Sequence, residues 1–173
     1  STTCTTVSTD TDPLSCTVDN LVNGTAYTFT VVATNAAGDS QPDTSDPVTP
    51  RTVPDAPVIT SASPAATQQV TVSWTAPADN GGSAITGYTV SANPAGSSTT
   101  CTTVSTDTDP LSCTVGNLDN GTAYTFTVVA TNAAGNSQTA TSAAATVTPR
   151  TTPGAPTGLV GLVGDGEVLL GWT

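Results

Sequence analysis

Short runs in which apolar and polar residues alternate dominate the chain between residues 52 and 150. Alternation with a period of two is typical of a half-buried strand, because successive side chains point to opposite faces of a sheet. Gly, Pro, Asn and Asp bound the runs and favour tight turns. Thr and Val fill much of the space between them, and both favour strands. The pattern therefore predicts an all-β fold with short connections.

Seven runs are predicted as strands, and turns are predicted between them at residues 79–82 and 132–135. The predicted strands are residues 58–61, a run with Val70, Val72 and Trp74, a run with Tyr88 and Val90, residues 99–104, a run with Leu111, Cys113 and Val115, a run with Tyr124, Phe126, Val128 and Ala130, and residues 138–147. Seven strands in about 97 residues is the pattern of an immunoglobulin-like antiparallel β-sandwich.

The sequence also repeats itself. Residues 98–138 match residues 1–41 with three differences, and residues 151–173 resemble residues 52–75. The differing pairs are Asp19 and Gly116, Val22 and Asp119, and Asp39 and Asn136. Repeats of this length predict an array of similar units. We expect the C-terminal half of one repeat at 1–51, a complete repeat at 52–150 and the N-terminal strands of a further repeat at 151–173, together forming a stretch of a longer array.

Composition narrows the possible functions. The net charge is −11, His and Lys are absent, and Arg51 and Arg150 are the only basic residues. An acidic chain without a basic patch excludes nucleic acid as a partner. Acid–base and nucleophilic catalysis usually depend on His, Lys or a free Cys. We therefore predict that the chain is not an enzyme and carries no cofactor.

No run reaches the roughly 18 apolar residues that a membrane span requires, so we expect no membrane insertion in this segment. The best candidate, residues 158–172, is interrupted by Asp165 and Glu167. No signal peptide is recognisable, and we expect any such segment to lie outside this chain or to have been removed.

Several motifs occur in a fixed order in the complete repeat: Trp74, the sequence DNGGSAITGY at 79–88, Leu118, GTAY at 121–124, Val128, Ala130, Asn132 and Gly135. The partial repeats carry matching residues, namely Leu21, Gly24, Thr25, Tyr27, Asn35 and Trp172. These motifs resemble the fibronectin type III family, and its bacterial secreted branch in particular. The resemblance implies two antiparallel sheets, with Tyr124 and Tyr27 as tyrosine-corner residues. The Arg-Gly-Asp tripeptide through which human members bind integrins is absent, so that function does not carry over.

All aromatic residues fall on positions that we expect to face a core. The predicted core residues are Trp74, Tyr88, Leu118, Tyr124 and Phe126 in the complete repeat, and Tyr27, Phe29 and Trp172 in the partial repeats. Sugar binding normally uses exposed aromatic rings. Since none is left for an exposed platform, this pattern argues against a carbohydrate-binding face.

Four cysteines permit three pairings. The repeat favours Cys4–Cys16 and Cys101–Cys113, because each repeat then carries its own bridge. Free buried thiols are the alternative. A metal site is disfavoured, because there is no His and four thiolates would have to meet from two repeats. Each bridge would stabilise its domain by about 3 kcal/mol and would indicate an oxidising compartment.

Two pairs of Asp residues are weaker candidates for a metal site. Asp107 and Asp109, with their copies Asp10 and Asp12, suit a weak calcium site because hard cations bind several oxygens. A solvated turn before Pro110 is the interpretation that we favour.

Turn residues are also expected in two further motifs. Asp79 and Asn80 are interpreted as turn residues. Asn23 and Asn120 begin Asn-Gly-Thr sequences, which fit N-glycosylation. In the family these residues lie in a turn for structural reasons, and we favour that interpretation.

We expect a non-catalytic structural repeat of a secreted or cell-surface protein that acts as a rod-like stalk, an adhesin or an extracellular filament component. One alternative is a spacer module in a secreted polysaccharide-degrading enzyme, and another is a loop-mediated ligand-binding module. The expected partners are neighbouring repeats of the same or identical chains, together with an extracellular protein or glycan surface.

Overall fold

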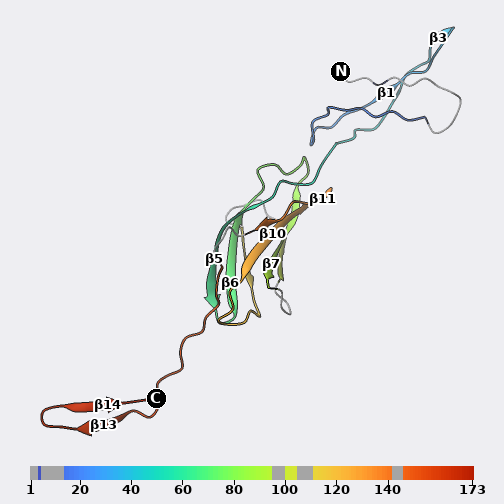
Figure 1. Cartoon of the computed structure of the whole chain (residues 1–173). Coiled ribbons are helices and arrows are strands. Elements are labelled where there is room, and N and C mark those ends of the chain that lie inside the picture. The colour runs from blue at the N-terminus through green and yellow to red at the C-terminus, as the bar shows by residue number, and fades with distance from the viewer. Residues whose placement is uncertain (1–3, 5–13, 95–99, 105–110, 142–145) are drawn as a thin grey trace.

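The computed structural model describes Cys4 and residues 14–94, 100–104, 111–141 and 146–173. Strands, turns and irregular segments make up these residues, and they include no helix, in agreement with the predicted all-β fold. Consistent with this, no described segment has the helical length and apolar character of a membrane span. Figure 1 shows N-terminal hairpins, a central sandwich and a C-terminal hairpin, which follow one another along an extended chain.

Two antiparallel sheets form the central sandwich. One sheet contains, in spatial order, β5 (Val58–Ala66), β6 (Gln69–Thr75) and β9 (Leu111–Val115). The other contains, in spatial order, β11 (Gly135–Asn136), β10 (Thr125–Asn132), β7 (Ile85–Asn93) and β8 (Thr100–Val104), with β12 (Ala140–Thr141) also paired to β10. The longest pairing joins β7 to β10 at the centre of the second sheet.

The core lies between these sheets. Burial alternates along β6, along β10 and along β7 from Tyr88 onward, because every second side chain of a strand points into the space between the sheets. Trp74 from one sheet and Tyr88 from the other pack with ring centroids 5.4 Å apart. Tyr88, Leu118, Tyr124 and Phe126 are buried, and Trp74 is 0% exposed.

The first and last strands of the sandwich differ in length from the prediction. β5 continues past residue 61 and through Pro64 to Ala66. Pro is tolerated there because β5 lies at the edge of its sheet and its register with β6 shifts directly after Pro64. Among the described residues of the predicted last strand, residues 138–147, β12 and a bridge between Val147 and Tyr124 are paired. Residues 142–145 fall outside the described residues.

Two small hairpin pairings form the N-terminal part. β1 (Thr30–Val31) pairs with β4 (Asp43–Thr44), and β2 (Thr34–Asn35) pairs with β3 (Gly38–Asp39). Tyr27 and Phe29, which we expected in a core, are only partly buried, with ring centroids 6.4 Å apart. The reason is that no second sheet covers these strands among the described residues.

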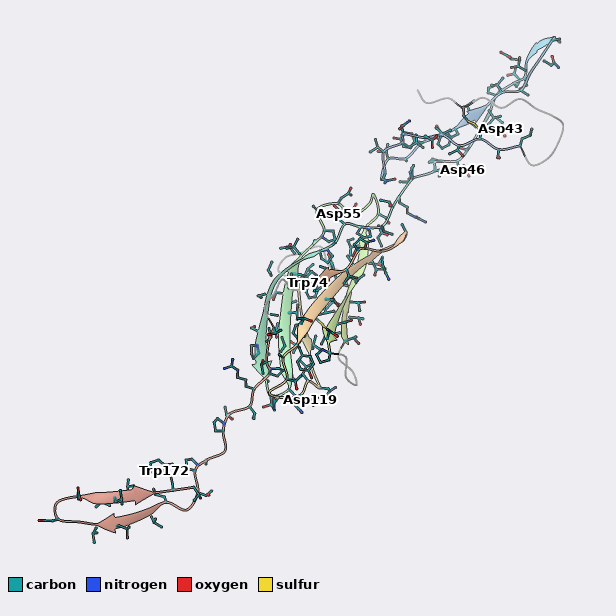
Figure 2. All side chains as sticks on the ribbon, viewed as in Figure 1. Asp43, Asp46, Asp55, Trp74, Asp119 and Trp172 are labelled. Carbon is teal, nitrogen blue, oxygen red and sulfur yellow. A yellow bond between two sulfur atoms is a disulfide. The ribbon has the colours of Figure 1, made fainter. Side chains whose placement is uncertain are left out.

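A single hairpin forms the C-terminal part, from β13 (Val160–Val163) and β14 (Val168–Gly171). Trp172, at the base of this hairpin, is 62% exposed and does not lie in a core (Figure 2). Its copy Trp74 is buried because β7 and β10 pack over β6, whereas β14 pairs only with β13 in the described chain. A strand position therefore predicts the direction of a side chain, but a facing sheet is needed to bury it.

Candidate functional site

Groups that could perform catalysis or hold a metal are scarce. Across the described ranges, no cluster of three or more His, Cys, Asp or Glu side chains is placed to hold a metal ion. The calcium candidates Asp107 and Asp109, and their copies Asp10 and Asp12, lie outside the described residues. The polar features that remain are turns, the linker before the sandwich and the disulfides.

Both predicted disulfides are present, and no cysteine is free. Cys101 lies in β8 and Cys113 in β9, so this bridge joins the edge strands of the two sheets, with Cα atoms 6.4 Å apart. Cys4 and Cys16 are joined in the N-terminal part, with Cα atoms 6.2 Å apart. The Cys101–Cys113 bridge therefore holds the sandwich closed along one side.

The turn at residues 79–82 is stabilised by its own side chains. Asp79 Oδ1 accepts a hydrogen bond from the Gly81 amide at 2.8 Å, and Asn80 Oδ1 accepts one from the Gly82 amide at 2.9 Å. Gly81 and Gly82 have φ angles of 72° and 76°, in the left-handed region that glycine occupies without steric cost. Asp79 and Asn80 thus have the local role that their sequence predicts.

The linker that enters the sandwich is bonded to this turn. The Thr52 amide donates to the Gly81 carbonyl at 2.9 Å, and the Asp55 amide donates to the Asp79 carbonyl, also at 2.9 Å. Backbone hydrogen bonds of this kind hold a linker in one path, because the donors and acceptors they use cannot shift independently.

Asn132, at the end of β10, also holds the linker. It is buried (4% exposed), and its Nδ2 donates to the carbonyl oxygens of Thr52 and Asn80, both at 2.8 Å. Its Oδ1 accepts from the amides of Ala134 at 2.8 Å and Gly135 at 3.2 Å. One side chain therefore ties together the linker, the turn at 79–82 and the β10–β11 hairpin.

Sequence reasoning placed Asn132 only at the start of a turn. Its bond to Thr52 spans 80 residues of sequence, and no local pattern signals a contact of that range. Its copy Asn35 makes the local bond to the Ala37 amide at 2.8 Å, which is the part that the turn prediction captures.

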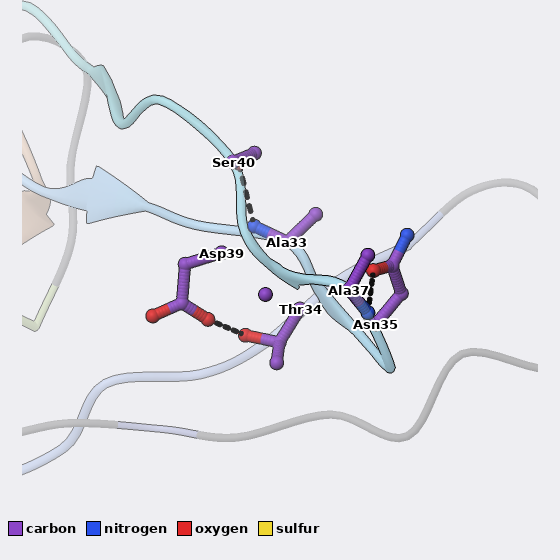
Figure 3. A pocket seen from close by; sticks show the side chains of 7 residues that line it. Ala33, Thr34, Asn35, Ala37, Asp39 and Ser40 are labelled. Carbon is purple, nitrogen blue, oxygen red and sulfur yellow. Dashed lines mark hydrogen bonds between the residues drawn. The ribbon is translucent and has the colours of Figure 1, made fainter.

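A shallow hollow of about 360 Å³ lies on the β2–β3 hairpin (Figure 3). Its polar groups bond to one another: Thr34 Oγ1 donates to Asp39 Oδ1 at 2.6 Å, and the Ala33 amide donates to Ser40 Oγ at 3.0 Å. The same two bonds recur in the sandwich, from Thr131 Oγ1 to Asn136 Oδ1 and from the Ala130 amide to Ser137 Oγ. The hollow is thus a feature of the hairpin itself, and its polar atoms are engaged in holding the hairpin together.

The turn that contains Asn120 has a structural role. Asn120 Oδ1 accepts a hydrogen bond from the Gln68 amide at 3.1 Å. The hydroxyl of Tyr124 accepts one from the Asp119 amide at 3.0 Å, which is the tyrosine-corner arrangement that the resemblance implied. In the N-terminal part the Tyr27 hydroxyl accepts the same bond from the Val22 amide, also at 3.0 Å.

Two packed antiparallel sheets, a tyrosine corner and a bridge between the sheets define an immunoglobulin-like β-sandwich. The sequence profile of the Fibronectin type III domain matches residues 55–148, more than half of the chain. The chain therefore belongs to the fibronectin type III family. Members of this family are typically non-catalytic modules of extracellular, cell-surface or muscle proteins.

The chain is similar to several solved structures. Domains d3–d4 of the rat CD45 extracellular region match at 20% identity and a TM-score of 0.51, covering 82% of this chain and 74% of that one. Domains A168–A170 of titin match at 28% identity and a TM-score of 0.49, covering 76% of this chain and 42% of that one. The chicken CNTN1 FN1–FN3 domains match at 19% identity and a TM-score of 0.45, covering 90% of this chain and 54% of that one. The chain thus spans less than half of the titin fragment that it matches.

Proposed function

We propose that the chain is a structural segment of a secreted or cell-surface protein, in which successive fibronectin type III repeats form a rod-like stalk or filament. The observation that carries the proposal is the bonded linker. Thr52 and Asp55 are held to the turn at 79–82 by backbone hydrogen bonds, and Asn132 holds Thr52 a second time. A linker anchored in this way fixes the orientation of one unit relative to the next, as a rod requires.

The repeat pattern supports the same function. The sequence Thr-Pro-Arg-Thr occurs at residues 49–52, before the central sandwich, and again at residues 148–151, after it. A Pro in each linker restricts the backbone and keeps the connection stiff. Near-identical units on such linkers form a quasi-one-dimensional array in which each unit contacts mainly its neighbours.

The disulfides support an extracellular or cell-surface location. Structural disulfides persist in oxidising compartments and are rare where thiols are kept reduced. The Cys101–Cys113 bridge joins the two sheets of the sandwich, so it contributes to the stability of the repeat itself. In an array of such repeats, the partners of the segment are neighbouring repeats of the same or identical chains.

Electron microscopy of the natural full-length protein tests the proposal. We expect a thin, extended particle whose length increases with the number of repeats in the gene. A compact catalytic domain flanked by a few repeats would overturn the proposal and would favour a spacer in a secreted polysaccharide-degrading enzyme.

A further inference from the structure

Gly81 and Gly82, which we call the glycine turn, approach two other segments so closely that no side chain fits. A Cβ atom on Gly81 would lie 2.2 Å from the Thr52 carbonyl oxygen. A Cβ atom on Gly82 would lie 2.2 Å from the Gly24 nitrogen and 2.5 Å from the Asn23 carbonyl carbon. Because these neighbours are backbone atoms, they could not give way without moving the chain.

The contact at Gly82 joins two different parts of the molecule. Gly24 belongs to the N-terminal part, whereas Gly82 belongs to the central sandwich. The Gly24 amide donates to the Pro50 carbonyl at 2.9 Å, and two residues later the Thr52 amide donates to the Gly81 carbonyl. The Asn23–Gly24 turn, the linker and the glycine turn therefore form one backbone-to-backbone junction.

An equivalent turn lies at the opposite end of the sandwich. Gly121 has a φ angle of 86°, close to the 81° of Gly24, and its amide donates to the Pro149 carbonyl at 3.0 Å. A Cβ atom on Gly121 would meet nothing within 4 Å in the described chain, so the surface that Gly24 uses at the first junction is open at Gly121.

We infer that the Asn120–Gly121 turn is a docking surface, and that its occupant is the corresponding glycine turn of the following repeat. This inference rests on the proposed function, because it requires a following repeat. The linker after Pro149 has the same Thr-Pro-Arg-Thr sequence as the linker at the first junction. Residues 151–173 resemble residues 52–75, which precede the glycine turn, in the Pro and Ala-Pro near their start and in the Trp-Thr at their end. Each repeat thus presents a side-chain-free turn at one end and its complement at the other.

Matched variants of the 173-residue chain test the junction that the structure contains. Gly24→Ala and Gly121→Ala place the same methyl group on the same type of turn at nearly the same φ angle, so they carry equal local strain. Only Gly24 faces another part of the molecule, since its Cβ would lie 3.0 Å from the Gly82 Cα. We expect Gly24→Ala to shift the amide NMR signals of Gly81 and Gly82, and Gly121→Ala to leave both unchanged.

Gly82→Ala provides the reciprocal measurement. We expect it to shift the amide signals of residues 23–25 and to abolish the nuclear Overhauser contact between Gly24 and residue 82. Gly116→Ala is its control, because a Cβ there meets nothing within 4 Å and the other copy carries Asp19 at this position. Unchanged signals at residues 23–25 in the Gly82 variant, or at the glycine turn in the Gly24 variant, would overturn the junction.

An extended chain tests the docking surface itself. Residues 76–149 are added after Thr173, which corresponds to Thr75, so that the third repeat gains its own glycine turn, and only the added segment is isotopically labelled. We expect Gly121→Ala to shift the signals of the added glycine turn. If these signals do not move, the inference is overturned. This outcome is separate from the particle length that tests the proposed function, since a rod could also form through the linkers alone.

Discussion

Residues 14–41 and residues 111–138 differ at three positions and share the same turn and hairpin hydrogen bonds, but only the second segment is part of a core. The Tyr27 amide of the first segment bonds to the Val48 carbonyl, and the Tyr124 amide of the second bonds to the Val147 carbonyl, both at 2.9 Å. Yet Val31 is 69% exposed while its copy Val128 is 0% exposed.

The difference between the two segments lies in what covers them. β10 pairs with β7, and β5 and β6 face it across the core, whereas β1 pairs only with β4 in the described chain. Turns and hairpin bonds therefore depend on a few tens of residues, while burial depends on strands that are distant in sequence. We expect the free energy of unfolding to depend mainly on burial. Substitutions at matched positions of the two segments should separate the contribution of burial from that of the local turns and hairpin bonds.

The largest effect is expected for the tryptophans. Removing the side chain of a buried Trp typically costs about 3–5 kcal/mol, so Trp74→Ala should unfold the central sandwich or come close to doing so. Trp172→Ala should leave the melting transition of the sandwich unchanged, because Trp172 is exposed on a separate hairpin. Calorimetric melts of the two variants make the comparison, and equal losses of stability would contradict it.

The disulfides are expected to differ next. Replacing Cys101 and Cys113 by Ser removes the bridge between the sheets and should lower the free energy of unfolding of the sandwich by about 3 kcal/mol. Replacing Cys4 and Cys16 should leave the sandwich transition where it is, since that bridge lies in the N-terminal part. Denaturant titrations monitored by Trp74 fluorescence, with Trp172 replaced by Phe, measure both, and a stable Cys101/Cys113 variant would show that core packing alone closes the sheets.

A smaller effect is expected for the paired asparagines. Asn132→Ala removes a buried amide that makes four hydrogen bonds and should cost about 1–3 kcal/mol, because the carbonyls of Thr52 and Asn80 lose a partner. Asn35→Ala removes one exposed bond, to the Ala37 amide, and should have little effect. Hydrogen exchange at the Thr52 amide provides a second measurement. We expect faster exchange in the Asn132 variant and unchanged exchange in the Asn35 variant.

The smallest effect is expected at the tyrosine corners. Tyr124→Phe removes the hydrogen bond from the Asp119 amide and keeps the ring, so the sandwich should lose about 0.5–1.5 kcal/mol. Tyr27→Phe removes the matching bond from the Val22 amide and should not change the sandwich transition. Urea melts of the two variants would contradict this view if both changed the transition equally.

The sequence allowed the strands to be located because alternation is strict in β6, in β10 and in β7 from Tyr88 onward, where both neighbours of a buried side chain face away from the core. The cysteine pairing followed from the repeat, and the turn roles of Asp79 and Asn80 followed from their type. These are local properties, which a chain expresses wherever the same residues occur.

Properties that depend on distant segments could not be obtained in this way. Trp172 has the same sequence context as Trp74, and its exposure is set by the lack of a facing sheet in the described chain. Asn132 acts on a linker 80 residues away, and the glycine turn acts on a turn of another part of the molecule. In each case the distant segment that contacts a residue, and not the sequence around that residue, determines whether the residue is buried or bonded.

The bridge between β8 and β9 also affects how the sandwich extends under load. A pulling force that enters through the linkers can straighten every unfolded residue except those between Cys101 and Cys113, whose sequence separation is 12. At roughly 3.3–3.6 Å for each extended residue, and after subtraction of the 6.4 Å that the bridge itself spans, the enclosed loop withholds about 33–37 Å of contour length from each unfolded sandwich. A reducing agent would release this length, so the contour length of the unfolded sandwich depends on the redox state of its surroundings.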